Sequence, residues 1–150
     1  MFRFAADGCV RWPVTVQQVQ EDGSTADVTI TVTYLRMTRD ELRTRTNALI
    51  AMNTQLAALA TPDHASDRMD LLNKRIDADD ALLRERVKGW AGVANADGAA
   101  LPYSAELRDA LIGDALLRRV LLDGLIEASE GVREKNSQPG LAGLPAVTQG

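Results

Sequence analysis

The sequence has very few of the residues that most often carry catalytic chemistry. One cysteine, Cys9, and one histidine, His64, occur among its 150 residues. A single cysteine cannot form a disulfide within the chain, which favours a reducing compartment such as the cytoplasm. His64 shares one turn with Asp63 and Ser66, whereas a catalytic triad needs groups that converge from different parts of a fold. We therefore expect no cofactor and no catalytic site, and we predict that the protein is not an enzyme.

Aromatic residues, positive charge and long apolar runs are also scarce. Aromatic side chains make up 4% of the sequence, so the core must be built mainly from Leu, Val, Ile and Ala. The formal net charge of −4 argues against a nucleic-acid-binding protein, which usually presents a basic surface. No apolar run approaches the roughly 20 residues that a membrane-spanning helix needs. The aspartates of residues 77–80 lack the glycine and glutamate of a calcium-binding loop. We therefore expect no nucleic acid, no membrane and no metal among its partners.

Two β-strands with a tight turn between them are expected early in the chain. Apolar residues alternate with others at residues 10–16 and again at 28–34, which is the pattern of strands with one buried face. Residues 1–36 are therefore predicted to form a β-hairpin, with residues 2–5 as a candidate third strand. One face of the hairpin needs a cover, because an isolated hairpin is only marginally stable in water.

Residues 38–88 are predicted to form an antiparallel helical hairpin. Thr38 and Glu41 have the spacing of a capping box, which begins a helix. Apolar residues recur every seven positions in both halves, as in helices that pack along a narrow seam. The first series is Leu42, Leu49 and Leu56, and the second is Met69, Ile76, Leu83 and Trp90. Charged residues interrupt the seams at Arg45, Asp79 and Arg86. Asp80 and Arg84 are spaced to form an ion pair on an outer face.

The stretch after this hairpin is expected to be a loop that is fastened to the core. Gly89 and Gly92 are poor residues for a helix interior, and Pro102 ends any regular element. Trp90 and Tyr103 bring large apolar surface into the stretch. This indicates anchoring, and we expect Trp90 to be a core residue.

Two further helices are predicted at residues 105–112 and 114–130, with Ser104 and Asp114 as N-caps and Gly113 between the helices. Nothing periodic follows residue 136, so residues 137–150 are expected to be a flexible tail. The predicted fold class is therefore α+β. An N-terminal β-hairpin packs with a mainly α-helical bundle in a single domain of residues 1–136, and the chain is mostly helical.

The last predicted helix has two apolar sides. The broad side, which should face the core, consists of Leu117, Val120, Leu121, Gly124, Leu125 and Ala128. Leu122 and Ile126 lie together on the other side, four residues apart and between charged residues. An apolar pair rimmed by charge is a candidate contact for another protein. The alternative is that the helix is buried on two sides within its own chain. We keep both interpretations, with Leu122 and Ile126 as candidate partner-binding residues.

The order of these elements resembles a known family. The motif VKGWAGV at residues 87–93 is followed by the turn Asp97-Gly98, the run LPYS at residues 101–104 and a leucine-rich final helix that ends near residues 135–136. Together with the hairpin and the capped helical region, this pattern is similar to the tail assembly chaperones of long-tailed bacteriophages. The resemblance covers most of the chain and is closest over residues 87–136. The charged region of residues 63–86 departs from it.

The resemblance implies a function in viral tail morphogenesis. Members of that family bind the tape measure protein, keep it soluble and help tail tube subunits to assemble around it. The expected partners are therefore the tape measure protein and tail tube subunits, with self-association as a further candidate. The expected location is the host cell cytoplasm, outside the mature virion. Leu122 and Ile126 are then expected to contact a helix of the tape measure protein. The alternative function is a small structural tail or neck component of the virion.

Overall fold

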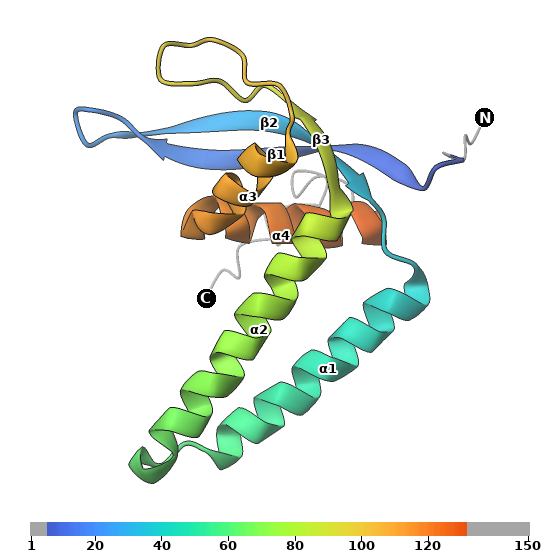
Figure 1. Cartoon of the computed structure of the whole chain (residues 1–150), viewed down its shortest axis with the longest axis vertical. Coiled ribbons are helices and arrows are strands. Elements are labelled where there is room, and N and C mark those ends of the chain that lie inside the picture. Colours follow the sequence, from blue (N-terminus) through green and yellow to red (C-terminus); the bar gives the residue numbers. More distant parts are fainter. Residues whose placement is uncertain (1–5, 132–150) are drawn as a thin grey trace, which may run out of the picture.

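The computed structural model describes residues 6–131. The candidate strand at residues 2–5 and the tail predicted at residues 137–150 lie outside the described residues. The chain forms a three-stranded antiparallel sheet. Two long helices between the second and third strands project away from the sheet, and two C-terminal helices pack beneath it (Figure 1). The predicted α+β class, mostly helical, is confirmed.

The hairpin predicted from the alternating pattern is present. β1 (Cys9–Val19) and β2 (Thr25–Leu35) pair along their whole length. One face of the hairpin is buried through Val14, Ile30, Val32 and Tyr34. On the other face, Thr15 and Thr29 are exposed, and their hydroxyl groups lie 3.1 Å apart in a hydrogen bond. The sheet therefore has one face that needs a cover and one that tolerates water.

The third strand of the sheet is β3 (Val87–Ala91), which pairs antiparallel with β2. The prediction of helix as far as residue 88 and of a loop after it is wrong at these residues. Trp90 lies opposite Val32, and Gly89 lies opposite Thr33. The open edge of β2 supplies backbone hydrogen-bond partners for this segment, and no local sequence pattern reveals such distant partners.

The connector after β3 is anchored, as predicted. The indole N–H of Trp90 donates a 2.9 Å hydrogen bond to the carbonyl of Leu101, and its ring meets that of Tyr103 edge-on with 4.8 Å between centroids. The Tyr103 hydroxyl donates to the carbonyl of Val87 over 2.9 Å. Trp90 is half-buried and packs against the core. The connector therefore folds back onto β3.

The two long helices form a projection that we call the arm. It consists of α1 (Arg39–Ala58), the short 3-10 turn η1 (Pro62–His64) and α2 (Ala65–Arg86). The predicted capping box is confirmed, since Thr38 Oγ1 accepts from the backbone N–H of Glu41 and the Glu41 carboxylate accepts from that of Thr38. The helices meet at η1, the tip of the arm, and diverge toward the sheet, where the arm has its root (Figure 1).

The C-terminal helices are α3 (Ala105–Gly113) and α4 (Ala115–Glu130). Ser104 and Asp114 cap them as predicted, each accepting backbone N–H groups from the first turn. Most of the predicted core side of α4 is confirmed, because Leu121, Gly124, Leu125 and Ala128 are buried, whereas Leu117 and Val120 are half-buried. They cover the apolar face of the sheet and complete the core.

Candidate partner-binding surface

The position of α4 depends on a close approach to the sheet at Gly124. A Cβ atom at residue 124 would lie 2.8 Å from the Tyr34 hydroxyl and 2.8 Å from Val14 Cγ2. The Tyr34 hydroxyl is itself fixed, because it donates a 2.9 Å hydrogen bond to the carbonyl of Leu121. Burial raises the pKa of Tyr34 far above its usual value. Only glycine leaves α4 this close to the sheet, and this closeness determines where its other sides point.

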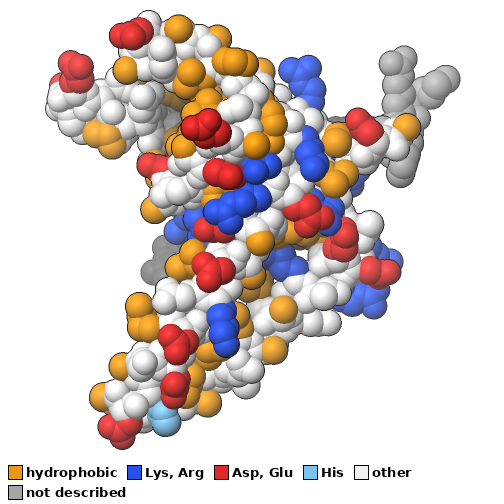
Figure 2. Space-filling view, in the orientation of Figure 1, with side chains coloured by type: hydrophobic (Ala, Val, Ile, Leu, Met, Phe, Trp, Pro, Cys, Tyr) orange, Lys and Arg blue, Asp and Glu red, His pale blue; other side chains and the backbone are white. Residues whose placement is uncertain are grey.

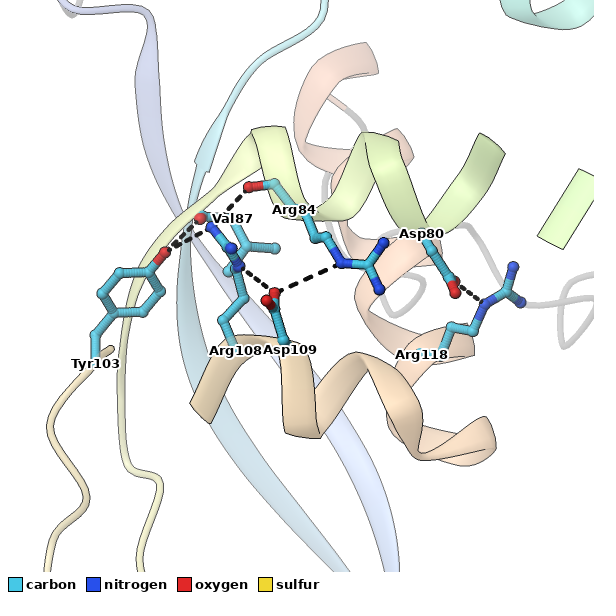
Figure 3. Close-up of polar contacts among 7 residues, drawn as sticks. All are labelled: Asp80, Arg84, Val87, Tyr103, Arg108, Asp109 and Arg118. Carbon is cyan, nitrogen blue, oxygen red and sulfur yellow. Dashed lines mark hydrogen bonds and ion pairs between the residues drawn. The ribbon is translucent and has the colours of Figure 1, made fainter. Parts of the chain in front are cut away.

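The side of α2 next to the C-terminal helices is held by polar contacts (Figure 3). Arg108 on α3 donates to the carbonyl of Arg84 over 2.8 Å, and Asp109 lies 3.6 Å from the Arg84 guanidinium. Asp80 pairs with Arg118 on α4. The predicted ion pair between Asp80 and Arg84 is therefore wrong. Both residues bind partners on other helices, which the spacing along α2 cannot indicate.

A second set of ion pairs joins α1 to α2 at the root of the arm and joins α2 to α4. Arg45 on α1 lies 3.1 Å from Asp79 on α2, and Arg118 lies 3.6 Å from the same carboxylate. Arg86 lies 2.9 Å from Glu41. Hydrogen bonds from the Thr38 backbone and from Arg86 lower the pKa of the Glu41 carboxyl. The charged residues that interrupt the two predicted seams therefore pair with charged residues across the arm or on α4.

Replacing Asp79 with asparagine should lower the free energy of unfolding by about 1–2 kcal/mol, because Arg45 and Arg118 would lose their shared anionic partner at a site that is mostly buried. Chemical denaturation measures this loss. Asp70→Asn is the matched control at an exposed position of the same helix, and its effect should stay within about 0.5 kcal/mol. Equal effects of the two substitutions would contradict a structural role for the ion pairs.

The seam between the two arm helices differs in part from the prediction. On α1 and its C-cap the half-buried residues are the predicted series Leu42, Leu49 and Leu56, the interrupting Arg45, and also Met52 and Leu59. On α2, however, Asp79 and Arg86 are buried, whereas Met69 is 56% exposed and Ile76 is 45% exposed. The assignment of Met69 and Ile76 to the seam is wrong. Asp79 faces α1, because it pairs with Arg45. Ile76 is three positions earlier on the same helix and therefore points about 60° to one side of that direction.

An apolar stripe of α2 consequently leaves the core and continues along the arm. It consists of Leu83, Ile76 and Met69, which recur every seven residues, and Leu83 is fully buried. Arg118 on α4 donates to the carbonyl of Ile76 over 3.2 Å, so the stripe emerges beside α4. In the face shown in Figure 2, hydrophobic side chains lie along the arm among carboxylates. We call these three residues the α2 stripe.

Leu122 and Ile126 lie on the side of α4 that is turned to the root of the arm. Arg118, one turn before Leu122, pairs with Asp80 on α2. Ser129, one turn after Ile126, accepts a 3.0 Å hydrogen bond from the backbone N–H of Met37. Leu122 and Ile126 themselves are half-buried against the core. Part of each side chain is therefore covered within the chain, and the rest is exposed close to the point where the α2 stripe emerges.

The sequence pattern did not identify Met69 and Ile76 as surface residues. A seven-residue repeat looks the same whether it faces another helix of the chain or solvent. The useful signal was the charge at Asp79 and Arg86, which occupy the neighbouring repeat positions. Each of these charges has a residue of opposite charge on α1, Arg45 for Asp79 and Glu41 for Arg86, which is consistent with both facing that helix.

Comparisons with known proteins give no match. No family model matches the chain, and neither a curated protein nor a solved structure matches it. Within residues 6–131, no helix has the length and apolar character needed to cross a membrane. Those residues also contain no group of three or more His, Cys, Asp or Glu side chains placed to hold a metal ion. The functional proposal therefore rests on the sequence motifs and on the surface of the arm and α4.

Proposed function

We propose that this protein is a tail assembly chaperone of a long-tailed bacteriophage. In this role it binds the tape measure protein in the host cytoplasm, keeps it soluble and helps tail tube subunits to assemble, and it is absent from the mature virion. The tape measure protein is a very long, helical and apolar client. Such a client needs a binding surface that offers apolar contacts in the spacing of a helix.

The observation that carries the proposal is the α2 stripe. It starts at a fully buried leucine and continues to two side chains that are about half exposed. A client helix that covered Met69 and Ile76 would gain about 1.5–3 kcal/mol per fully buried side chain. The carboxylates of Asp70 and Asp77, next in sequence to these residues, would keep the stripe soluble while no client is bound.

Leu122 and Ile126 extend this proposed client surface onto α4. They lie one and two turns beyond Arg118, the residue that fastens α4 to α2. A helix lying on the α2 stripe near the root of the arm would reach their exposed portions. The partner-binding role predicted for Leu122 and Ile126 thus becomes the inner end of a longer apolar surface.

The sequence resemblance supports the same function from a different part of the chain. Its motif residues form β3 and the connector, where Trp90 and Tyr103 fix the chain between α2 and α3. These residues determine how α2 leaves the sheet beside α4. They therefore position the proposed client surface, although they do not form it.

The double substitution Met69→Glu with Ile76→Glu should abolish the ability of the protein to keep its client in solution. Both side chains are about half exposed, so the melting temperature should stay within a few degrees of that of the parent. The measurement is the soluble fraction of the tape measure protein of the same phage when the two proteins are expressed together. The control is Gln17→Glu with Val19→Glu, which adds equal charge on the exposed hairpin and should leave the client soluble.

Four other outcomes decide between the remaining possibilities. If the parent protein does not raise the soluble yield of the client, the chaperone function is wrong. If purified phage particles contain the protein, the structural tail or neck component is correct instead. The double substitution Leu122→Glu with Ile126→Glu then tests the inner end of the surface. A folded variant without client protection supports the contact, whereas an unfolded variant assigns both residues to the core.

A further inference from the structure

A long continuous part of the arm contains no buried residue. From Thr38 to Ala78, every residue is half-buried or exposed. We call residues 38–78 the arm segment. It comprises α1, η1 and the part of α2 that precedes Asp79. The buried core consists of residues from the sheet, from the last turns of α2, from α3 and α4, and from Met37, so the core is complete without the arm segment.

The two helices of the arm segment meet along a seam that is only half-buried. On the α1 side the seam consists of Leu42, Leu49, Met52, Leu56 and Leu59. On α2, Leu72 and Arg75 are half-buried and lie in one line with Asp79, which pairs with Arg45 of α1. Apolar stabilisation is proportional to the area removed from water. This seam therefore contributes less than a closed core of the same side chains would.

Ion pairs fasten the arm segment at the root. The Arg45 guanidinium lies 3.1 Å from the Asp79 carboxylate, and the Glu41 carboxylate lies 2.9 Å from the Arg86 guanidinium. If α1 moves away, Asp79 keeps Arg118 as a partner at 3.6 Å. Arg86 keeps the carboxylate of the residue before it, at 3.4 Å. Detachment therefore leaves neither charge without a partner, and an unpartnered buried charge is the largest cost of breaking such pairs.

Non-helical residues flank α1 at both ends. Thr38 and Thr61 have extended backbones, with ψ angles of 164° and 151°. α1 and α2 meet at the tip and diverge toward the sheet (Figure 1), so α1 joins the body through the short connection that follows β2. Rotation in these connections moves α1 without breaking the pairing of β2 with its neighbouring strands. Few buried contacts and separate joints are typical of a part that opens independently of the core.

We propose that the arm segment opens as one unit while the sheet, the rest of α2, α3 and α4 stay folded. The inference does not rest on the proposed function. Helices gain most of their stability from tertiary packing, so both helices of the segment should unravel once they separate. Opening uncovers the leucines of the seam and removes the helical spacing of Met69 and Ile76. The closed and the open arm therefore present different apolar surfaces.

Native-state hydrogen exchange of the full chain, read by mass spectrometry, tests the proposal. Backbone amides of residues 39–78 should be protected at least about a hundredfold less than those of β2 and α4, because the arm opens without global unfolding. Equal protection of the arm segment and the sheet would overturn the proposal.

Trp90→Ala distinguishes opening of the arm from unfolding of the whole chain. Trp90 packs against the core and not against the arm segment, so it is equally packed in the closed and open forms. The substitution should speed exchange in β2 by at least about tenfold and change exchange in the arm segment by less than about threefold. If both accelerate by the same factor, the arm opens only when the chain unfolds, and the proposal is wrong.

Arg45→Gln should speed exchange in the arm segment by about tenfold, because only the closed arm contains the ion pair with Asp79. Arg43→Gln is the matched control two positions away. Arg43 pairs with Asp40 of its own helix and is exposed, so its loss should change exchange by less than about threefold. Equal effects of the two substitutions would show that the ion pair between the helices does not hold the arm closed.

Discussion

Trp90→Ala should lower the free energy of unfolding by about 3 kcal/mol, which is the lower end of the usual cost of removing a buried tryptophan. The lower end applies because Trp90 is half-buried rather than enclosed. The substitution removes the edge-on contact with Tyr103 and the 2.9 Å hydrogen bond to the carbonyl of Leu101. It also removes apolar surface packed on the core beneath β3. Denaturant unfolding, followed by circular dichroism, gives the loss.

Trp90→Phe separates the hydrogen bond from the packing. Phenylalanine keeps a ring for the Tyr103 contact and cannot donate to Leu101, so about half of the loss or less should remain. Faster amide hydrogen exchange in residues 92–104 should accompany both variants, because Trp90 holds the connector. A loss below about 1 kcal/mol for Trp90→Ala would contradict the anchoring role.

Gly124→Ala should destabilise the protein by about 1–3 kcal/mol, although alanine favours a helix over glycine by about 1 kcal/mol. The added Cβ atom would lie 2.8 Å from both the Tyr34 hydroxyl and Val14 Cγ2. Neither neighbour can move freely, because Tyr34 is hydrogen-bonded to Leu121 and Val14 is part of the core. The helix must then move away from the sheet, and its core contacts weaken together.

Gly113→Ala is the matched control for this prediction. Residue 113 ends α3, and a Cβ atom there would have no neighbour within 4 Å. The same substitution should therefore be neutral or slightly stabilising at residue 113 and destabilising at residue 124. Urea unfolding of the two variants compares them directly. Equal effects would show that the close approach of α4 to the sheet does not limit the residue at 124.

Short-range patterns in the sequence predicted most of the helices and strands. The alternation in β1 and β2 reports one buried face, and the Thr38–Glu41 pair reports the start of α1. Asp114 likewise marks the start of α4. Each of these signals depends on contacts between residues a few positions apart. Such contacts form in the same way whatever the rest of the chain does, which is why the sequence shows them.

The candidate surface was predictable only in part. The wheel of α4 set Leu122 and Ile126 apart from the core side, but in the structure both are half-buried against the core, as is Val120 of the predicted core side. How far these two side chains are buried depends on the elements that pack around α4. A helical wheel of α4 alone contains no information about those neighbours. Met69 and Ile76 were placed on the wrong side of α2, because the repeat alone does not say which neighbour it faces.

The sequence by itself determined the type of the two hairpin strands and of the four α-helices, the caps, most of the core side of α4 and the scarcity of groups for catalysis. Tertiary structure alone decided that residues 87–91 complete the sheet, that Asp80 binds Arg118 and not Arg84, and that Met69 and Ile76 are exposed. Each of these depends on groups distant in sequence: the open edge of β2, the arginine on α4 and the paired charges at the arm root. Hydrogen-bonding and charged groups that leave water must find partners in the folded chain. The identity of those partners is a property of the whole fold, and no single segment contains it.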